Sequence, residues 1–177
     1  SYIKDSHATN LSGEALRTDT EKRLWQGGDN AKQAFHLQLA HNYTKLHQGK
    51  AKPDLQGVFE FMRLLNISQR LYNQIDLAKA SQADKNKLAL GAFSKKDLSR
   101  PDLVYVLSSK IMGYDLKAMF ALYGLPVSDT AHASVALLNL PMAPLSFYAQ
   151  PFNRSNHLNE GTWLTLPATG LVPNYPY

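Results

Sequence analysis

The sequence predicts a mainly α fold: a helical bundle of six or seven helices with a small extended or β cap at its C-terminal end. Helix start signals and glycine stops alternate along residues 13–138, and the apolar side chains between them recur at spacings of three and four. After Pro141, prolines interrupt short extended runs instead. We therefore expect residues 1–140 to form the bundle. Residues 141–177 should form a Pro-rich cap packed on the same single domain.

The first half of the chain predicts three helices after a loop over residues 1–12. The first covers 13–26 and ends at two glycines. The second begins at Asp29 or Asn30 and runs to about Gln48. The third covers 56–75 and has a wide apolar face, which predicts burial on more than one side. That face consists of Val58, Phe59, Met62, Leu65, Ile67, Leu71, Tyr72 and Ile75.

The second half predicts four shorter helices from their capping residues. Ser81 with Asp84 marks the start of a helix through Leu90, stopped by Gly91. The other three helices begin at Ser99, Asp115 and Ser128, and the first two of them end at Gly113 and Gly124. Beyond them, 145–149 and 162–166 are predicted strands that could pair.

These assignments predict which side chains are buried and where two glycines lie. Gly113 and Gly124 should both stand at helix C-termini, where a left-handed residue ends a helix. The residues expected in the core are Trp25, Phe59, Met62, Leu65, Leu107 and Phe120.

Composition narrows the class of protein. The chain has 177 residues, 44% of them apolar, which suffices for one domain with a core. It has no cysteine, which excludes disulfides, thiolate nucleophiles and Cys-based zinc sites. No apolar run is long enough to span a bilayer. The net charge is +5, but the cations are scattered, so we expect a solvated basic surface and no nucleic-acid partner.

The residues that catalysis would need are not found in recognisable patterns. None of the six histidines begins an HExxH motif. His36 and His41 lie five residues apart, which separates them by roughly 140° around a helix and prevents shared metal ligation. There is no Gly-x-Ser-x-Gly elbow and no P-loop. We therefore expect no catalytic residue and no metal or other cofactor in this chain.

Two polar or aromatic groupings are candidate binding residues. Gln38 and His41 lie three apart and share a helix face, where they could present a donor and an acceptor to a substrate or a neighbouring domain. The alternative is that they hydrogen-bond within the bundle. Tyr148 and Trp163 could stack on a sugar, although aromatic residues are also the usual filling of cores and interfaces.

Four blocks of the sequence resemble a known family. They are Lys22-Arg-Leu-Trp25, Ala34-Phe-His-Leu-Gln-Leu-Ala-His41, Met112-Gly-Tyr-Asp-Leu-Lys-Ala-Met-Phe-Ala-Leu-Tyr-Gly124 and Pro144-Leu-Ser-Phe-Tyr-Ala149. Their order and their aromatic, glycine and capping positions resemble the C-terminal helical region of the enhancin-like M60 zinc metalloproteases. The likeness is greatest to the secreted immunomodulating metalloproteases of Pseudomonas and the mucin-degrading enzymes related to them.

The resemblance implies a function for a larger parent protein. The parent would be a secreted or periplasmic bacterial zinc metalloendopeptidase that acts on glycoproteins. Its zinc would be held by the two His of HExxH and a downstream Glu, and none of these ligands has a counterpart here. The chain alone would be inactive and would support the catalytic domain, its main partner. Gln38 and His41 would belong to the cleft wall. The alternative is a stand-alone helical module that binds a glycan or a protein.

Overall fold

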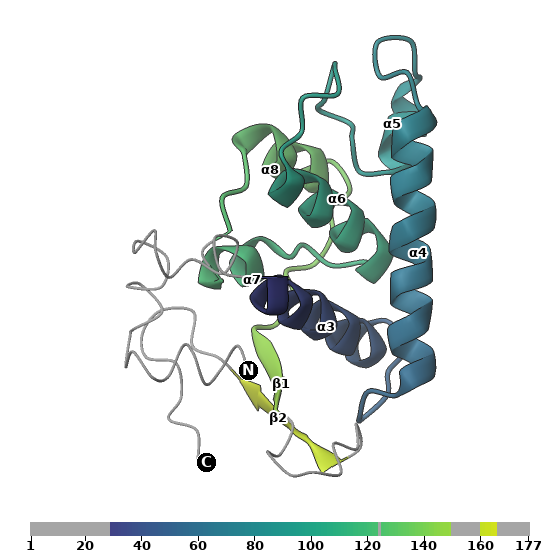
Figure 1. The fold of residues 1–177 in the computed structure, drawn as a ribbon. Coiled ribbons are helices and arrows are strands. Elements are labelled where there is room, and N and C mark those ends of the chain that lie inside the picture. The colour runs from purple at the N-terminus through teal and green to yellow at the C-terminus, as the bar shows by residue number, and fades with distance from the viewer. Residues whose placement is uncertain (1–28, 124, 150–159, 166–177) are drawn as a thin grey trace. The chain divides into compact units, whose positions relative to one another are not determined.

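The computed structural model describes residues 29–123, 125–149 and 160–165. These residues form helices and one two-stranded antiparallel sheet (Figure 1), which confirms the predicted mainly α class with a small strand pair. The predicted helix over 13–26, with Trp25, and the predicted stop at Gly124 lie outside the described residues. The elements are α3 (Asp29–Leu46), α4 (Leu55–Gln74), α5 (Gln82–Lys87), α6 (Arg100–Met112), α7 (Lys117–Leu122), α8 (Asp129–Ala136), β1 (Ser146–Ala149) and β2 (Thr162–Thr165).

The chain divides into two compact units. Unit 1 contains α3, the start of α4 as far as Phe59, residues 121–125 and both strands. Unit 2 contains residues 60–120 and 126–143, and therefore the rest of α4 with α5, α6 and α8. The organisation into one domain that the sequence suggests stays a prediction.

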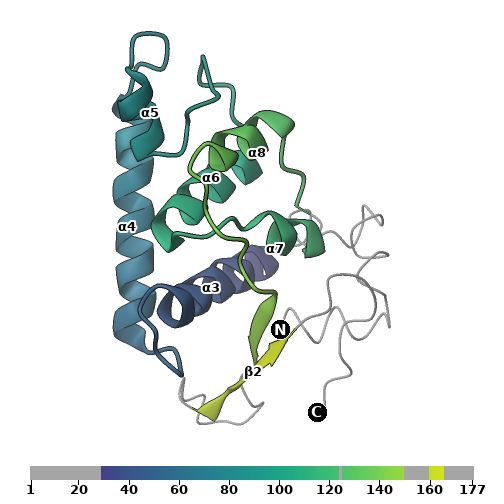
Figure 2. The same ribbon diagram turned by 180° about the vertical axis from the view of Figure 1, so that it is seen from behind.

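Unit 1 is a helix laid against a strand pair, and both Figure 1 and Figure 2 show β1 beside α3. Phe35, Leu39 and Tyr43 are buried along one stripe of α3, as their spacing of four predicts. Both predicted strands form and pair, with Tyr148 directly opposite Trp163. Every residue of β1 is buried. The polar main chain of β1 therefore needs partners on both of its edges.

Unit 2 is organised by capped helices. The Ser99 side chain accepts from the Asp102 main-chain N–H, and the Asp102 carboxylate accepts from the Ser99 N–H, which forms a capping box at the start of α6. The helix ends at Gly113, whose φ of 75° is left-handed, as predicted. Ser128 caps α8, which lies beside α6 in both ribbon views. Local capping chemistry thus sets these boundaries.

The burial predictions hold for α6 and α7 and are wrong for α4. Leu107 and Phe120 are each 1% exposed, as expected. Phe59 is 66% exposed, and Met62 and Leu65 are only half-buried. The helix is covered along one stripe and not on several sides.

The covered stripe of α4 contains a residue that the predicted face omitted. Phe61 is fully buried, and it lies three residues after the buried Val58. Phe59 follows Val58 directly and is therefore turned by about 100° away from it. Apolar content alone did not distinguish these two phenylalanines, because both continue the run of apolar residues.

The short helix α5 ends earlier than predicted. Ser81 caps it, as expected, but its last residue is Lys87, and Leu90 falls outside it. The chain turns at Ala89, whose φ is 55°, and the Leu90 N–H donates a hydrogen bond to the Lys85 carbonyl at 2.9 Å. This turn buries the side chains of Leu88 and Leu90, and that burial outweighs the local signal of Gly91.

Candidate functional site

The strongest polar constellation lies in unit 1, where two amide side chains of α3 hold the main chain of β1. Gln38 Nε2 donates to the Tyr148 carbonyl and Gln38 Oε1 accepts from the Tyr148 N–H, both at 2.9 Å. Asn42 Nδ2 donates to the Ser146 carbonyl at 3.3 Å, and Ser146 Oγ donates to Asn42 Oδ1 at 2.6 Å. All four residues are buried. We call this arrangement the α3–β1 clamp.

The spacing of the clamp follows from helix and strand geometry. Gln38 and Asn42 lie four residues apart on one helix face, an advance of about 6 Å. Tyr148 and Ser146 lie two apart on one side of a strand, an advance of about 6.6 Å. The two repeats nearly match, so each amide meets one strand residue. The helix thereby satisfies main-chain groups that a third strand would otherwise pair.

His41 lies beside the α3–β1 clamp, between α3 and β1. Its side chain is 3% exposed, and its ring meets the Tyr148 ring edge-on at 5.3 Å. Neither ring nitrogen has a hydrogen-bond partner among the described residues. Burial lowers the pKa of His41 to about 4, so the imidazole is uncharged near neutral pH. The predicted donor–acceptor pair is therefore brought together, but both members face the interior of unit 1.

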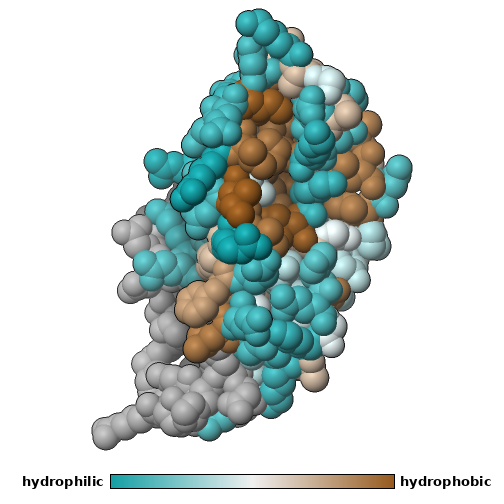
Figure 3. Space-filling view, turned by 90° about the vertical axis from the view of Figure 1, so that its right-hand side faces the viewer, coloured by the Kyte–Doolittle hydropathy of each residue, from teal (hydrophilic) through white to brown (hydrophobic). Residues whose placement is uncertain are grey.

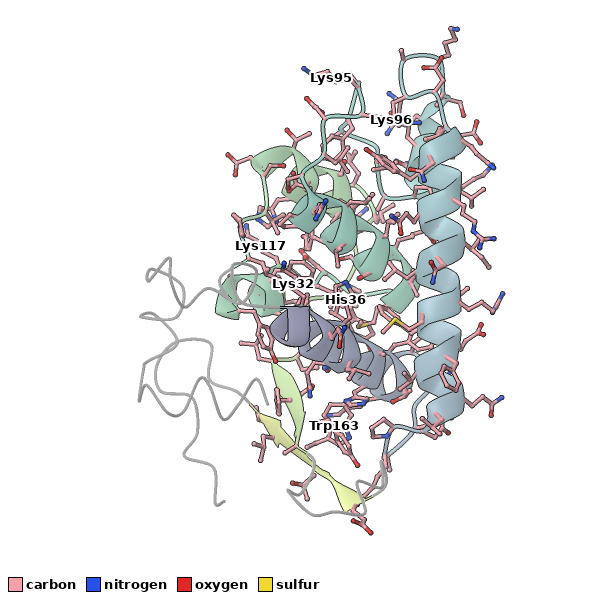
Figure 4. The ribbon with its side chains drawn as sticks, in the orientation of Figure 1. Lys32, His36, Lys95, Lys96, Lys117 and Trp163 are labelled. Carbon is pink, nitrogen blue, oxygen red and sulfur yellow. The ribbon has the colours of Figure 1, made fainter. Side chains whose placement is uncertain are left out.

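Tyr148 and Trp163, the predicted sugar-stacking residues, also meet, with ring centroids 4.9 Å apart. Figure 4 shows Trp163 on β2 below α3. The Lys45 ammonium lies 4.4 Å from the centre of the Trp163 ring, and the indole N–H donates to the Ala51 carbonyl at 2.9 Å. Tyr148 is 1% exposed. A sugar could reach Trp163 over the same ring face only after Lys45 moved away.

Gly161 makes the close approach of the two strands possible. A Cβ atom there would lie 2.5 Å from the Ala149 carbonyl oxygen and 2.7 Å from the Tyr148 ring. Lys52 Nζ donates to the Gly161 carbonyl at 3.0 Å. Burial raises the pKa of the Tyr148 phenol, and the hydrogen bond from the Gly161 main chain opposes this with a smaller effect. The site is therefore a packed contact between uncharged aromatic rings, with Lys45 and Lys52 at its edge.

A second cluster, in unit 2, was not predicted from the sequence. The Tyr105 hydroxyl donates to Asp115 Oδ1 at 2.6 Å, and the same oxygen accepts from the Lys117 N–H at 2.8 Å. The Tyr105 ring meets the His132 ring edge-on at 5.2 Å. Burial, and then Asp115, raise the pKa of Tyr105, so the phenol stays protonated. Burial is the main cause that lowers the pKa of His132, followed by Lys117.

Of the two residues that form the central hydrogen bond of this cluster, only Asp115 could be recognised from the sequence. Asp115 was recognised in the sequence as a cap, and it lies two residues before the first residue of α7. Its partner Tyr105 belongs to the preceding helix and has no local feature that marks it. The cluster fixes the start of α7, and this is a structural role.

The donor atoms of the described residues do not fit a zinc site. Across residues 29–123, 125–149 and 160–165, no three His, Asp or Glu side chains gather closely enough to hold a metal ion. Zinc in proteins is held by three or four such ligands. The same residues include no helix that is long and apolar enough to cross a membrane.

Comparison with known proteins gives one clear likeness. No family model and no curated protein matches the chain. Among solved structures, IMPa metallopeptidase from Pseudomonas aeruginosa matches 99% of the chain with a TM-score of 0.77 and 25% identity. IMPa in complex with T-antigen matches 100% of the chain, also with a TM-score of 0.77 and 25% identity. IMPa in complex with an O-glycopeptide matches 99% of the chain with a TM-score of 0.75 and 23% identity.

The likeness confirms the resemblance to a Pseudomonas metalloprotease that the four sequence blocks indicated. This chain spans 20% of the length of those metallopeptidase chains. It is therefore a structural relative of one segment of a metallopeptidase.

Proposed function

We propose that the chain is a C-terminal helical subdomain of a secreted bacterial zinc metalloprotease of the M60 type that acts on glycoproteins. The observation that carries the proposal is the structural likeness of the whole chain to a fifth of a metallopeptidase. Two of the matched structures contain a glycan antigen or an O-glycopeptide, which supports a glycoprotein substrate for the parent.

The chemistry of this chain supports a non-catalytic role. Its described residues offer no ligand set for zinc, and the sequence has no HExxH motif. The metal and the general base would therefore belong to the remainder of the parent protein. This chain would support that catalytic domain and line part of its cleft.

Gln38 and His41 would act on the cleft wall through β1. Both side chains are buried, so neither reaches a substrate directly. Gln38 fixes the main chain of Tyr148, and His41 packs on the Tyr148 ring. We propose that they set the position of the strand pair, which would present the wall.

The test compares this chain with the product of the complete gene on an O-glycosylated peptide. We expect cleavage by the complete product, loss of cleavage with a chelator and recovery with zinc. The isolated chain should not cleave. The control is the complete product with the HExxH Glu changed to Gln, which should lose activity without losing zinc. Cleavage by the chain alone, or a complete gene without HExxH, would contradict the proposal.

The alternative is a stand-alone module that binds a glycan through Trp163. It predicts that the isolated chain retains O-glycopeptide on a surface and that Trp163→Ala abolishes this binding. We expect no binding by either form, because Lys45 covers the Trp163 ring and Tyr148 is buried. Binding that disappears in the variant would favour the module.

A further inference from the structure

A histidine without a hydrogen bond lies at the contact between α3 and β1. The His41 side chain is 3% exposed, and neither of its ring nitrogens has a partner within the part of the chain that the structure describes. The β1 carbonyls of Ser146 and Tyr148 already accept from Asn42 and Gln38. Buried polar side chains usually have at least one hydrogen-bond partner. The neutral His41 ring is therefore held here by packing, and these groups offer no free acceptor to a second N–H.

Protonation of His41 would be costly in this position. The neutral ring carries one N–H donor, whereas the protonated ring carries two donors and a positive charge. A buried charge that lacks a partner of opposite sign is strongly unfavourable. In water the same charge is solvated, so the penalty disappears. The protonated ring therefore favours a state in which the contact between α3 and β1 is open.

The titratable groups of the elements at this contact offer no negative charge to His41. Tyr148 on β1 stays a neutral phenol, because burial raises its pKa. Lys45 lies one turn further along α3, and Lys52 follows that helix. The strand β2 carries no titratable side chain. A protonated His41 would therefore meet a neutral ring and cations.

The carboxylates of the flanking loops do not neutralise a charge on His41 either. Asp54 accepts from Lys50 Nζ and from the Gly57 N–H, both at 2.7 Å. The exposed Glu160 precedes β2. The pKa of His41 is lowered by burial, and no carboxylate of the described residues acts on it. Water is the environment in which the charged ring is stable, and the ring reaches it only when the contact opens.

The strand pair depends on α3 to stay folded. Each of its strands has four residues. An isolated two-stranded sheet is marginally stable at best in water. Figure 1 and Figure 2 show β1 beside α3, and the clamp joins the two elements. Loss of this contact should release both strands, whereas α6 and α8 in unit 2 keep their own caps.

We propose that His41 is an acid-sensitive latch between α3 and the strand pair: a proton on its ring releases β1 and β2 from α3, while unit 2 stays folded. The proton is taken up when the contact opens and the ring reaches water. It then prevents closure, because closing would bury the charge. Return to neutral pH removes the proton, and the contact closes again. This inference goes beyond the proposed function and does not rest on it, since it concerns only the folding of this chain.

The test measures amide hydrogen exchange of the complete gene product at pH 7 and pH 5. Mass spectrometry of peptides that cover 145–149 and 162–165 gives the protection of the strand pair, which is the ratio of the intrinsic to the observed exchange rate. The pKa of His41 is about 4 in the closed state and about 6.5 when the ring is in water, so the protection should fall about twentyfold between pH 7 and pH 5. It should recover after return to pH 7.

A segment of unit 2 and two variants provide the controls. The segment is the part of α4 after Phe59, which contains no histidine; Figure 3 looks onto this helix and shows hydrophobic and hydrophilic side chains along it. Its protection should change less than about twofold, because it does not open with the strand pair. His41→Phe keeps a ring against Tyr148 and takes up no proton, so its strand pair should stay protected at pH 5. Gln33→Leu, at an exposed position of α3, should behave as the unmodified protein does.

Three outcomes would overturn the inference. Protection that falls equally on α4 indicates that acid unfolds the whole chain, and a fall that persists in His41→Phe indicates another titrating group. Unchanged protection in the unmodified protein means that His41 does not open the contact. If His41→Phe does not fold, His41→Leu takes its place. The exchange needs no catalysis, so the result is independent of whether the complete product cleaves an O-glycopeptide.

Discussion

Single residues decide how the strand pair of unit 1 is held. Gln38 gives Tyr148 both a donor and an acceptor, and Asn42 does the same for Ser146. Asn42 is also the first residue of an Asn-x-Thr sequon, yet its side chain is fully buried, so it is not available for glycosylation in this fold. A mutation in the clamp therefore acts on the position of a strand that is distant in sequence.

Gln38→Leu should destabilise the fold. The leucine fills a similar space but leaves the Tyr148 N–H and carbonyl buried without those partners, which costs about 1–3 kcal/mol of unfolding free energy. Urea unfolding followed by circular dichroism measures the change. Gln33→Leu, at an exposed position of the same helix, is the matched control and should change stability little. Equal stability of the two variants would remove the clamp as a source of stability.

His41 should make the fold sensitive to mild acid. Burial lowers its folded pKa to about 4, below the unfolded value of about 6.5. Between these values the unfolded state binds more protons, so stability rises with pH over this window and falls as pH decreases from about 6.5 to about 4. The loss should reach about 2–4 kcal/mol, since one pKa unit corresponds to about 1.4 kcal/mol.

The variant His41→Leu isolates this effect. It should flatten the dependence of unfolding free energy on pH between about pH 6.5 and 4, because no proton is then taken up at this site. Urea titrations at several pH values measure the slope. Gln33→Leu, at an exposed position of α3, removes no titratable group and should leave the slope unchanged. An unchanged slope in His41→Leu would mean that His41 is not kept neutral by burial.

At the scale of elements, one carboxylate joins two helix starts in unit 2. Asp102 Oδ2 accepts from the Ser99 N–H at the start of α6, and Oδ1 accepts from the Ser128 N–H at the start of α8, at 2.7 Å. Asp102 is 4% exposed. The capping box of α6 is therefore extended to a second helix, and this contact helps to explain why α6 and α8 lie side by side.

Asp102→Ala should weaken both helix starts together. Loss of a cap costs about 1 kcal/mol, and loss of the part-buried hydrogen bond from the Ser128 N–H adds about 0.5–1.5 kcal/mol, so we expect about 2 kcal/mol in total. Thermal unfolding measures the total, and amide hydrogen exchange at Ser128 measures the effect on α8. Asp102→Asn keeps an acceptor and should cost less. Asp129→Ala removes an exposed first-turn carboxylate of α8 and should cost at most about 0.5 kcal/mol.

At the scale of the whole molecule, several of the cations behind the net charge of +5 have local partners. Lysines form ion pairs with nearby carboxylates, as in Lys50–Asp54 and Lys87–Asp84, both at 2.7 Å. Lys45 and Lys96 lie over aromatic rings. Cations engaged in this way are less available to bind phosphates.

The chain should therefore bind duplex DNA weakly. Fluorescence anisotropy with a short labelled duplex should give a Kd above about 10⁻⁵ M at 150 mM salt, within the range of non-specific contact. A titration over a range of salt concentrations provides the control, because a protein that contacts many phosphates loses affinity steeply with salt. Tight binding with a steep salt slope would restore nucleic acid as a partner.

The sequence by itself determined most helix starts and the positions of both strands, although α5 ends before the predicted residue. Ser99, Gly113 and Ser128 stand where they were predicted, because capping depends on atoms within about four residues of the cap. The two strands form where they were predicted, because their β-forming side chains are also local features.

Only the tertiary structure decided which side of each element is covered. Phe59 and Phe61 cannot be told apart by the local sequence, yet Phe59 is exposed and Phe61 is buried. The reason is that the residues that cover α4 are distant in the chain. Gln38 reaches a strand 110 residues away, and no local pattern encodes that pairing. Hydrophobic burial depends on which surfaces meet in the folded chain. Nearby residues therefore specify the helices and strands, whereas the contacts between these elements are decided only by the fold.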